Sequence, residues 1–582
     1  MLMPAHTPLL PDVLDNIPRN RLMLALLLFT AIMIFSGIGL RSPWPADEPR
    51  FAEVAREMVA SGQWLLPMRG GELYPDKPPV FMWSIAAFFW LTGNLKLAFL
   101  LPNALCSLLS LALVFDLGSR LWNQRTGALA ALLLILAPQF LVQAQRAQID
   151  AMVACWTMVA CYGLIYHFFI RRSWKWYFTA WGFMGLGIIT KGVGFLPALL
   201  FVPIIALKLQ DTSRFSDSLT WRCALGPVVM LLVVAAWLIP MTLHVNQLGT
   251  EEALAYRNNI LFKQTGERYA DSWGHINPWH YYLSSVVPTL WFPLPLLLLA
   301  LSRPLLRTLR RQPVSLTMLA WVALVIAFFS LSPGKRGVYI LPALPLLALT
   351  LAPILAKQKP ARWFSPVLTG AHGLLAIALI TIGILAWNDH PRLVAKITDY
   401  TQDLSHLHEA GTLVFGLGLI WLIGLVGFWR SNALARFFVS LMLSWLLFTT
   451  WGYRILEPLR TPRNVLAAAE QHIPAHGQLG MINFSEQFLL FSKRDFTHFS
   501  FFSTLEQENR NAWLWMLETS DSFLIVEASD NLSCFTMKGA QPLGTAHREN
   551  YVLLTDQQAK SHCPPPQRIR HFTTPRPGDW LD

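Results

Sequence analysis

The sequence contains few charged residues: Asp, Glu, Lys and Arg make up 14% of its 582 positions. Soluble globular proteins carry roughly a quarter of such residues, so this shortage excludes an ordinary soluble protein. Hydrophobic residues make up 54% of the chain. Apolar runs long enough to cross a bilayer as helices recur from about residue 22 to about residue 453. The composition therefore predicts a polytopic α-helical membrane protein with a more polar tail.

The sequence also lacks motifs that indicate other classes of protein. It has no Walker loop or dinucleotide fingerprint, no zinc-finger spacing, and no basic stripe interleaved with aromatic residues. A nucleic-acid partner is therefore not expected, although the formal net charge is +12. Most of that surplus lies in short clusters between apolar runs, which is typical of loops retained in the cytoplasm.

Cysteine is scarce, with six residues in the chain. Those inside apolar runs are expected to be small core residues: Cys106, Cys155, Cys161 and Cys223. Cys534 and Cys563 lie in the tail, where a disulfide can form if the tail is outside the cytoplasm. No cleavable signal peptide is expected, because the first apolar run is too long and no small-residue cleavage site follows it.

The apolar runs predict about thirteen membrane spans. They lie at about residues 22–40, 98–118, 127–145, 151–170, 177–190, 193–208, 222–243, 281–301, 315–331, 338–356, 364–387, 411–429 and 433–453. The run at 79–92 is apolar but short, so we expect a helix at the membrane interface. Basic loops alternate with loops of mixed charge; residues 41–78 hold five basic and six acidic residues. This bias places the N-terminus in the cytoplasm and the tail outside.

The chain is thus predicted to have three parts. Residues 1–21 form a cytoplasmic tail, residues 22–453 a transmembrane domain with a functional outer loop at 41–79, and residues 454–582 a soluble periplasmic domain. In the last part, helical patterns at 464–472 and 506–518 alternate with strand-like runs at 478–484, 522–527 and 551–555. This alternation predicts a small α/β domain. Its proline- and arginine-rich end, from residue 564, is expected to lack regular structure.

The first outer loop is the most informative stretch for function, because charges near hydrocarbon are costly and indicate a functional site. Asp47 and Glu48 directly precede a helical pattern that includes Arg50. A helix N-cap with ion pairs at i,i+3 and i,i+4 is the alternative explanation. Tyr74 follows, and then Lys77, which two prolines place at the mouth of the membrane. A lysine that merely snorkels to the interface is the alternative there.

More polar residues lie at the outer ends of later spans: Asp150, Lys191, Lys335, Arg336 and Tyr339. Helix capping alone is enough to explain a single aspartate such as Asp150. Each residue by itself is a weak signal. Together with the first loop, they predict one basic, aromatic-lined outer site that contains one or two carboxylates.

The outer loop at 245–280 and the residues beside it contain groups that can bind metals. They are Tyr269, Asp271, His275, His280, Tyr281 and Tyr282. Their spacing matches no firm metal motif, so no metal ligand is predicted. Anchoring of aromatic side chains at the membrane interface is the favoured role for this segment.

A basic site at headgroup level suits a lipid-phosphate-linked sugar, whose phosphate lies at the membrane surface and whose tail lies in the bilayer. When the glycosidic bond breaks, the departing phosphate gains negative charge. Cations such as Lys77, Arg50 and Lys335 would bind that charge more strongly than the starting diester, which stabilises the transition state. A carboxylate opposite them can accept a proton from an attacking hydroxyl, orient an acceptor, or stabilise an oxocarbenium ion.

These motifs resemble those of the integral-membrane glycosyltransferases that use polyprenyl-phosphate sugars. The chain is similar to the bacterial branch that contains the lipid A aminoarabinose transferase and the protein O-mannosyltransferase-like enzymes. The resemblance is carried by Asp47-Glu48-Pro-Arg50-Phe-Ala-Glu53, Asp76-Lys77-Pro78-Pro79, Arg146 to Asp150, Thr190-Lys191-Gly192, and Gly334-Lys335-Arg336 through Tyr339-Ile-Leu-Pro342. These motifs follow in family order over about residues 40–345.

The resemblance implies a GT-C-like fold and a role for each site residue. Asp47 would be the first-loop catalytic aspartate and Asp150 the second acidic position. Arg50 and Lys77 would hold the polyprenyl phosphate. The other residues would line the phosphate and sugar cavity or lie beside it: Lys191, Lys335, Arg336, Tyr339 and Tyr74. Single displacement with inversion is the expected stereochemistry.

The resemblance also implies partners and a location. The donor would be an undecaprenyl phosphate sugar, and the acceptor lipid A or lipopolysaccharide, another envelope glycan, or a protein. The chain would lie among the lipids of the bacterial inner membrane. No cofactor is implied, and a divalent cation stays an open alternative. Pro49, Phe51, Asp76 and residues 335–337 depart from the usual aminoarabinose transferase pattern, so the sugar and the acceptor stay open.

Two other classes of protein also need outer cations. A transporter or flippase of lipid-linked sugars would need a lipid groove as well, but such proteins often show inverted repeats and broken spans, and neither is seen in the sequence. A non-catalytic envelope assembly protein would depend on residues 460–582, and not on Asp47 or Lys77. The glycosyltransferase is the favoured interpretation.

Overall fold

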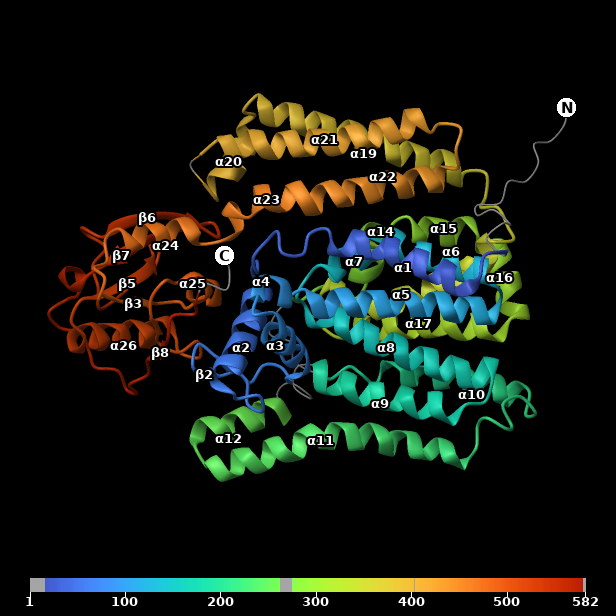
Figure 1. The fold of residues 1–582 in the computed structure, drawn as a ribbon, viewed down its shortest axis with the longest axis horizontal. Helices are drawn as coiled ribbons and strands as arrows, with labels where there is room; N and C mark the ends of the chain where they lie inside the picture. The colour runs from blue at the N-terminus through green and yellow to red at the C-terminus, as the bar shows by residue number, and fades with distance from the viewer. Residues whose placement is uncertain (1–15, 262–274, 402, 579–582) are drawn as a thin grey trace.

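The structure is a computed structural model that describes residues 16–261, 275–401 and 403–578. Long helices run side by side in one bundle, and a sheet lies beyond one end of it (Figure 1). The long helices include α1 (Arg19–Phe35), α5 (Leu101–Leu121), α8 (Ile149–Ile165), α9 (Trp174–Lys191), α11 (Leu225–Leu248), α17 (Pro313–Leu331), α18 (Leu344–Leu355), α19 (Phe364–Trp387), α21 (Ser405–Gly427) and α22 (Ala433–Leu447).

Eight helices of the described chain are long and apolar enough to cross a membrane, or up to ten if two bent pairs count as single spans. One pair joins α6 (Gln124–Leu136) to α7 (Pro138–Ala144), where a proline at the start of α7 interrupts the helix. The predicted polytopic helical membrane protein is therefore confirmed. Every predicted apolar run falls on a helix or helix pair, but the count of about thirteen spans stays a prediction.

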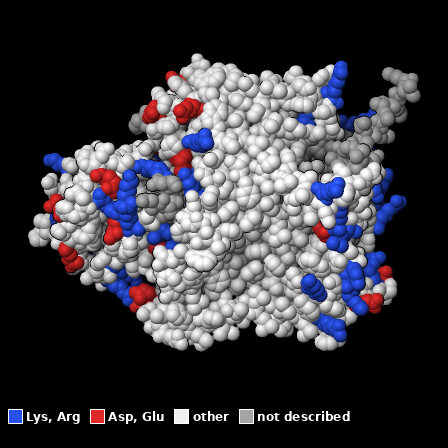
Figure 2. Space-filling model, viewed as in Figure 1, with Lys and Arg blue, Asp and Glu red and all other residues white. Residues whose placement is uncertain are grey.

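Charged side chains gather at the two ends of the molecule, with a broad uncharged belt between them (Figure 2). Exposed leucines such as Leu231 and Leu232 of α11 lie in the apolar segments. So many exposed large apolar side chains are expected where a protein is surrounded by lipid and not by water. The belt therefore marks the part of the chain that the bilayer covers.

The run predicted at 79–92 forms α3 (Val80–Thr92), which has 13 residues and is too short to cross the bilayer. It packs against α2 (Glu48–Ser61), with the rings of Phe51 and Phe81 edge to face at 5.2 Å. Trp90 and Leu91 remain exposed at its far end. Helix α3 thus fits the predicted position at the interface.

The chain after the last long helix forms a six-stranded sheet in the order β6-β7-β5-β3-β4-β8. The strands are β3 (Gln478–Met481), β4 (Phe496–His498), β5 (Ser522–Glu527), β6 (Gln541–Ala546), β7 (Glu549–Leu554) and β8 (Phe572–Thr574). Strand β3 is parallel to β4 and β5, and the other pairs are antiparallel. The helices are α24 (Arg463–Glu470), α25 (Glu486–Phe491) and α26 (Leu505–Glu518).

Both helices and all three strands predicted for this region are present, although β3 ends at Met481, earlier than expected. The prediction that the chain lacks regular structure after residue 564 is wrong at β8. This strand pairs with β4 along the edge of the sheet, where Thr573 lies opposite Thr497. A strand of three residues is too short to show the alternating pattern by which strands are predicted from a sequence. These residues form a strand because they pair with the edge of β4.

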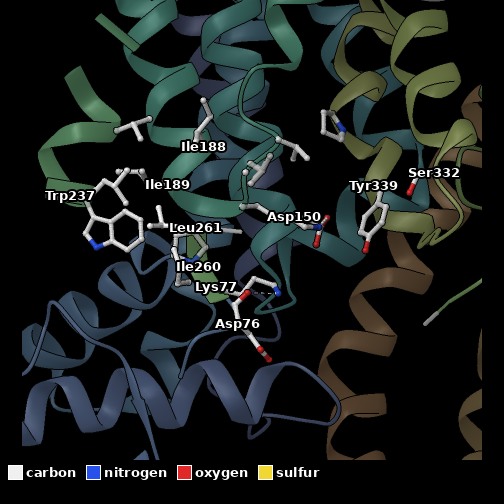
Figure 3. A pocket seen from close by; sticks show the side chains of 18 of the residues that line it. Asp76, Lys77, Asp150, Ile188, Ile189, Trp237, Ile260, Leu261, Ser332 and Tyr339 are labelled. Atoms are coloured by element: carbon white, nitrogen blue, oxygen red, sulfur yellow. Dashed lines mark hydrogen bonds and ion pairs between the residues drawn. The ribbon is translucent and has the colours of Figure 1, made fainter. Parts of the chain in front are cut away.

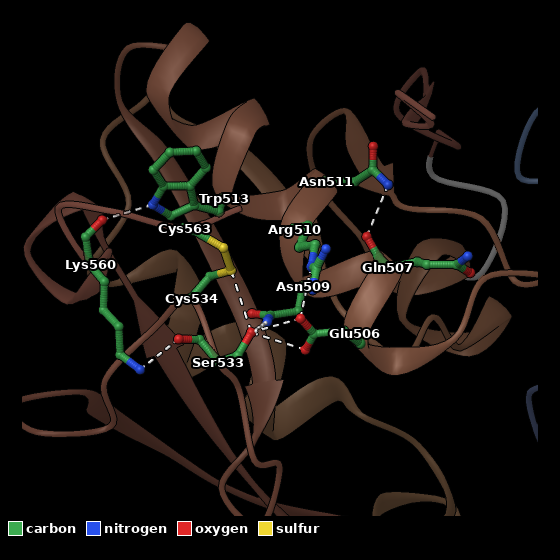
Figure 4. Close-up of a disulfide and its surroundings, with 10 residues drawn as sticks. All are labelled: Glu506, Gln507, Asn509, Arg510, Asn511, Trp513, Ser533, Cys534, Lys560 and Cys563. Atoms are coloured by element: carbon green, nitrogen blue, oxygen red, sulfur yellow. Dashed lines mark hydrogen bonds and ion pairs between the residues drawn. A yellow bond between two sulfur atoms is a disulfide. The ribbon is translucent and has the colours of Figure 1, made fainter. Parts of the chain in front are cut away.

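Cys534 and Cys563 form a disulfide, with their Cα atoms 5.3 Å apart (Figure 4). It joins the segment after β5 to the segment after β7. The remaining cysteines are free, and all but the half-buried Cys223 are buried, as expected for small core residues.

The sheet and its helices are docked on the first outer loop, which lies between them and the helical bundle (Figure 1). The Nε2–H of His498 donates to the carbonyl of Gly70 at 2.8 Å, and the hydroxyl of Ser500 donates to Glu72 at 2.7 Å. Gly70 has a φ of +66°, and a Cβ there would lie 2.7 Å from the His498 ring. Glycine is therefore required at this contact.

Candidate active site

Asp47 occupies the N-cap position of α2, but its side chain makes no capping hydrogen bond. Its Oδ2 instead accepts hydrogen bonds from Arg336 Nη2 at 2.7 Å and from Gln148 Nε2 at 3.0 Å. The capping alternative therefore does not describe this aspartate. Three segments that are far apart in the sequence meet at a single carboxylate.

The neighbouring Glu48 explains how Asp47 is held. Its buried carboxylate accepts from the Arg41 guanidinium at 2.7 Å, from the Trp44 amide at 2.9 Å, and from the Ala147 amide at 3.0 Å. A buried carboxylate needs such partners, because an unpaired charge is very costly there. Glu48 thus ties the first loop to the turn before α8, and this turn brings Gln148 to Asp47.

The environment of Asp47 keeps it ionised. Burial alone would raise its pKa, but the charge and hydrogen bond of Arg336, the hydrogen bond from Gln148, and the charge of Arg50 outweigh burial. The pKa of Asp47 is therefore below the ordinary value for an aspartate. A carboxylate with a lowered pKa is a weak proton acceptor.

A cavity of about 260 Å³ is lined by Asp150 at the start of α8 and by Lys191 at the end of α9, and Asp47 does not line it. Charged and polar side chains line one part of it, and apolar side chains such as Ile189, Trp237 and Ile260 line the rest. Figure 3 shows Asp150 between Lys77 and Tyr339. The cavity therefore has a charged wall next to an apolar wall, and a lipid phosphate needs both.

The polar wall of the cavity is formed by Asp150, Lys191 and Tyr339. Asp150 and Lys191 are joined by an ion pair, and the Lys191 ammonium lies 4.3 Å from the centre of the Tyr339 ring. Asp150 is not the N-cap of α8, because Gln148 occupies that position. Capping therefore does not explain Asp150, which instead pairs with the last residue of α9.

Arg336 connects the two acidic positions. Burial lowers its pKa, but the negative charges of Asp47 and Asp150 outweigh burial and raise it. Lys77 completes the cationic side of the cavity; its ammonium donates to the backbone carbonyl of Asp76 at 2.8 Å. Ion pairs or the shared cavity thus bring together five of the predicted residues, and their role in one site stays a prediction: Asp47, Asp150, Lys77, Lys191 and Arg336.

Arg50 and Tyr74 lie beside the cavity without lining it. Arg50 Nε donates to Glu486 of α25 at 2.9 Å. Tyr74 is fully buried, and burial together with the negative charge of Asp76 raises its pKa. Its phenol therefore stays protonated near the charged groups of the first loop.

Lys335 is held differently from the other predicted cations. Its ammonium donates to the backbone carbonyls of Ser332 at 2.5 Å and Asn277 at 2.8 Å, and the residue is only 4% exposed. Its neighbour Gly334 lines the cavity. Tyr269 and Asp271 of the rejected metal site lie outside the described residues.

Comparisons with known proteins show what this chain resembles. Residues 76–239 match the family model described as dolichyl-phosphate-mannose-protein mannosyltransferase. Undecaprenyl phosphate-α-4-amino-4-deoxy-L-arabinose arabinosyl transferase 1 of Pseudomonas fluorescens is 31% identical over 387 residues, covering 65% of this chain and 66% of the relative. The corresponding transferase of Pseudomonas savastanoi is 28% identical over 362 residues, covering 60% and 63%. The matched region thus spans slightly less than two thirds of these relatives.

Among solved structures, ArnT from Cupriavidus metallidurans bound to undecaprenyl phosphate matches with a TM-score of 0.71 at 20% sequence identity. The match covers 93% of this chain and 99% of that one. The fold is therefore the polytopic helical membrane fold of that protein. More particularly, the chain resembles the undecaprenyl phosphate aminoarabinose arabinosyl transferases, and the resemblance predicted from the motifs is confirmed.

Proposed function

We propose that this protein is a glycosyltransferase that moves a sugar from undecaprenyl phosphate to lipid A at the periplasmic face of the bacterial inner membrane. The observation that carries the proposal is the cavity in which Lys77, Lys191 and Asp150 meet an apolar wall. Relatives named for the use of an undecaprenyl phosphate sugar support the donor class. Their names support aminoarabinose as the sugar.

The chemical step needs positive charge where the phosphate departs. As the glycosidic C–O bond breaks, the bond's electron pair moves to the phosphate, which becomes a dianion-like leaving group. Lys77 and Lys191 at the cavity stabilise this charge more strongly than that of the donor diester, and so lower the barrier. The apolar wall holds the first isoprene units of the carrier.

In the proposed reaction, Asp47 is an ionised group that orients the reacting partners. A phosphate of lipid A is already a nucleophile, so no proton has to be removed before it attacks the sugar. The lowered pKa of Asp47, with burial opposed by the charge of Arg336, fits that role better than general-base catalysis. Attack from the face opposite the departing phosphate inverts the anomeric centre.

The two ends of the molecule support the proposed orientation in the membrane. Helix α16 (Ser302–Arg311) lies at the end away from the sheet (Figure 1) and carries exposed Arg303, Arg307, Arg310 and Arg311. Such a basic rim favours the cytoplasmic side. The disulfide between Cys534 and Cys563 lies at the other end, and disulfides persist in the periplasm.

Labelling of single cysteines tests this orientation. In a functional variant without its native free cysteines, a cysteine at position 47 or 77 is expected to react with a membrane-impermeant maleimide added outside spheroplasts. A cysteine at position 307 on α16 should react only after the membrane is opened. Labelling of positions 47 and 77 from opposite compartments would contradict the proposed site.

Mass spectrometry of lipid A from cells with and without this protein tests the function. Wild-type cells are expected to carry lipid A whose mass is increased by a sugar, and cells lacking the protein should lose that species. The matched family model, named for a protein mannosyltransferase, favours a protein acceptor as the second candidate. Glycopeptide analysis of the same cells distinguishes the two, because only one class of product disappears.

A further inference from the structure

One residue of the C-terminal part reaches into the first outer loop. Glu486 begins α25, and its Oε1 lies 2.9 Å from Arg50 Nε and 3.1 Å from Arg69 Nη1. Its carboxylate is largely buried. One oxygen atom therefore joins two cations of the loop to a helix that follows them by more than 400 positions.

The contact uses only one of the nitrogens of Arg50. Within the described part of the chain, no further hydrogen bond or ion pair of Arg50 is present besides that of its Nε with Glu486. The side chain is 30% exposed. Its two terminal nitrogens are thus left as a planar fork, which is the geometry that binds phosphate in a bidentate manner.

The same carboxylate keeps the second cation in place. Arg69 lies over the Phe501 ring, 3.3 Å from its centre, and is buried. Burial lowers the pKa of Arg69 and the nearby Arg50 lowers it further, whereas Glu486 opposes both effects. Without Glu486, two neighbouring guanidinium groups would repel each other, and Arg50 would have no fixed position.

We propose that Glu486 is a positioning residue for the donor phosphate. It holds Arg50 through Nε and so directs the terminal nitrogens of Arg50 towards the phosphate of the carrier lipid. This inference rests on the proposed function. It also assigns a function to the C-terminal part, because the carboxylate that holds Arg50 comes from α25 and not from the transmembrane part.

If Glu486 instead competes with the phosphate, its replacement should change phosphate binding in the opposite direction. If Glu486 occupied Arg50 in place of the phosphate, a neutral side chain at position 486 would free Arg50 and tighten phosphate binding. In the proposed role, the neutral side chain loosens Arg50 and weakens phosphate binding. The sign of the change therefore decides between positioning and competition.

The experiment uses the purified full-length protein and its Glu486→Gln variant, with undecaprenyl phosphate as an inhibitor of sugar transfer. The inhibition constant and the KM for the donor are expected to rise about 10-fold in the variant. Glu470→Gln is the matched control, since Glu470 pairs with Arg494 within the C-terminal part. It should leave both constants unchanged.

A double variant separates positioning from a general loss of structure. If Glu486 acts through Arg50, adding Glu486→Gln to Arg50→Gln weakens inhibition no further. An additive loss, an unchanged constant or tighter inhibition in the single variant would each overturn the positioning role. A wild-type protein that undecaprenyl phosphate does not inhibit would overturn the proposed function itself.

Discussion

Replacing Asp47 by asparagine is expected to reduce sugar transfer by at least about 100-fold, the loss typical when one preorganised electrostatic contact is removed from an active site. Asparagine keeps the size of the side chain but loses the negative charge of the carboxylate, whose Oδ2 accepts from both Arg336 and Gln148. The measurement is the initial rate of transfer by purified protein at saturating donor. Expression and the melting temperature should change little, because Glu48 still ties the loop to the turn before α8 in the variant.

Asp116→Asn is the control for this variant. Asp116 is also an ion-paired aspartate, bound to Arg120 at 2.5 Å near the end of α5, away from the cavity. Its variant should transfer sugar at close to the wild-type rate. Full activity of Asp47→Asn would remove Asp47 from the chemistry and leave Asp150 as the acidic group of the site.

Loss of the Lys191 ammonium is expected to lower kcat/KM for the donor by about 100-fold in Lys191→Gln. The charge stabilises the departing phosphate, and it also pairs with Asp150 at the cavity wall. Glutamine is polar and about one bond shorter than lysine, but it carries no charge. The rate should therefore fall even at saturating donor, because the interaction strengthens in the transition state.

Lys208→Gln supplies the comparison for Lys191. Lys208 lies near the end of α10 (Phe201–Gln210), and its ammonium lies 3.5 Å from the backbone carbonyls of Thr212 and Arg214. Kinetics of the two variants under the same conditions isolate the effect of charge in the cavity. A rise in KM with unchanged kcat for Lys191→Gln would show that Lys191 binds the donor without acting on the chemical step.

The sequence predicted much of this architecture because hydropathy and length report directly on helices that cross a bilayer. It also predicted the charged site, since ionisable residues at the outer ends of spans have few reasons to be there other than function. Five residues were grouped in this way, and their role in the site stays a prediction: Asp47, Asp150, Lys77, Lys191 and Arg336. Their close association follows from the common end of the bundle, not from their separation in the chain.

The groups that hold these residues could not be predicted in the same way. Arg41 pairs with Glu48 across a turn, and Glu486 meets Arg50 across 436 positions. No periodicity or local spacing encodes such contacts, because they arise from how loops pack. The same applies to Lys335. Its place near the outer site was predicted from the sequence, but hydrogen bonds to backbone carbonyls determine where its ammonium points.

Transfer by the purified protein in proteoliposomes tests the central claim most directly. The liposomes contain an undecaprenyl phosphate sugar labelled in the sugar, together with lipid A. We expect label to appear on lipid A and one equivalent of undecaprenyl phosphate to be released, with Asp47→Asn inactive. Movement of the intact labelled donor between leaflets, without release of undecaprenyl phosphate, would contradict the account and identify a transporter.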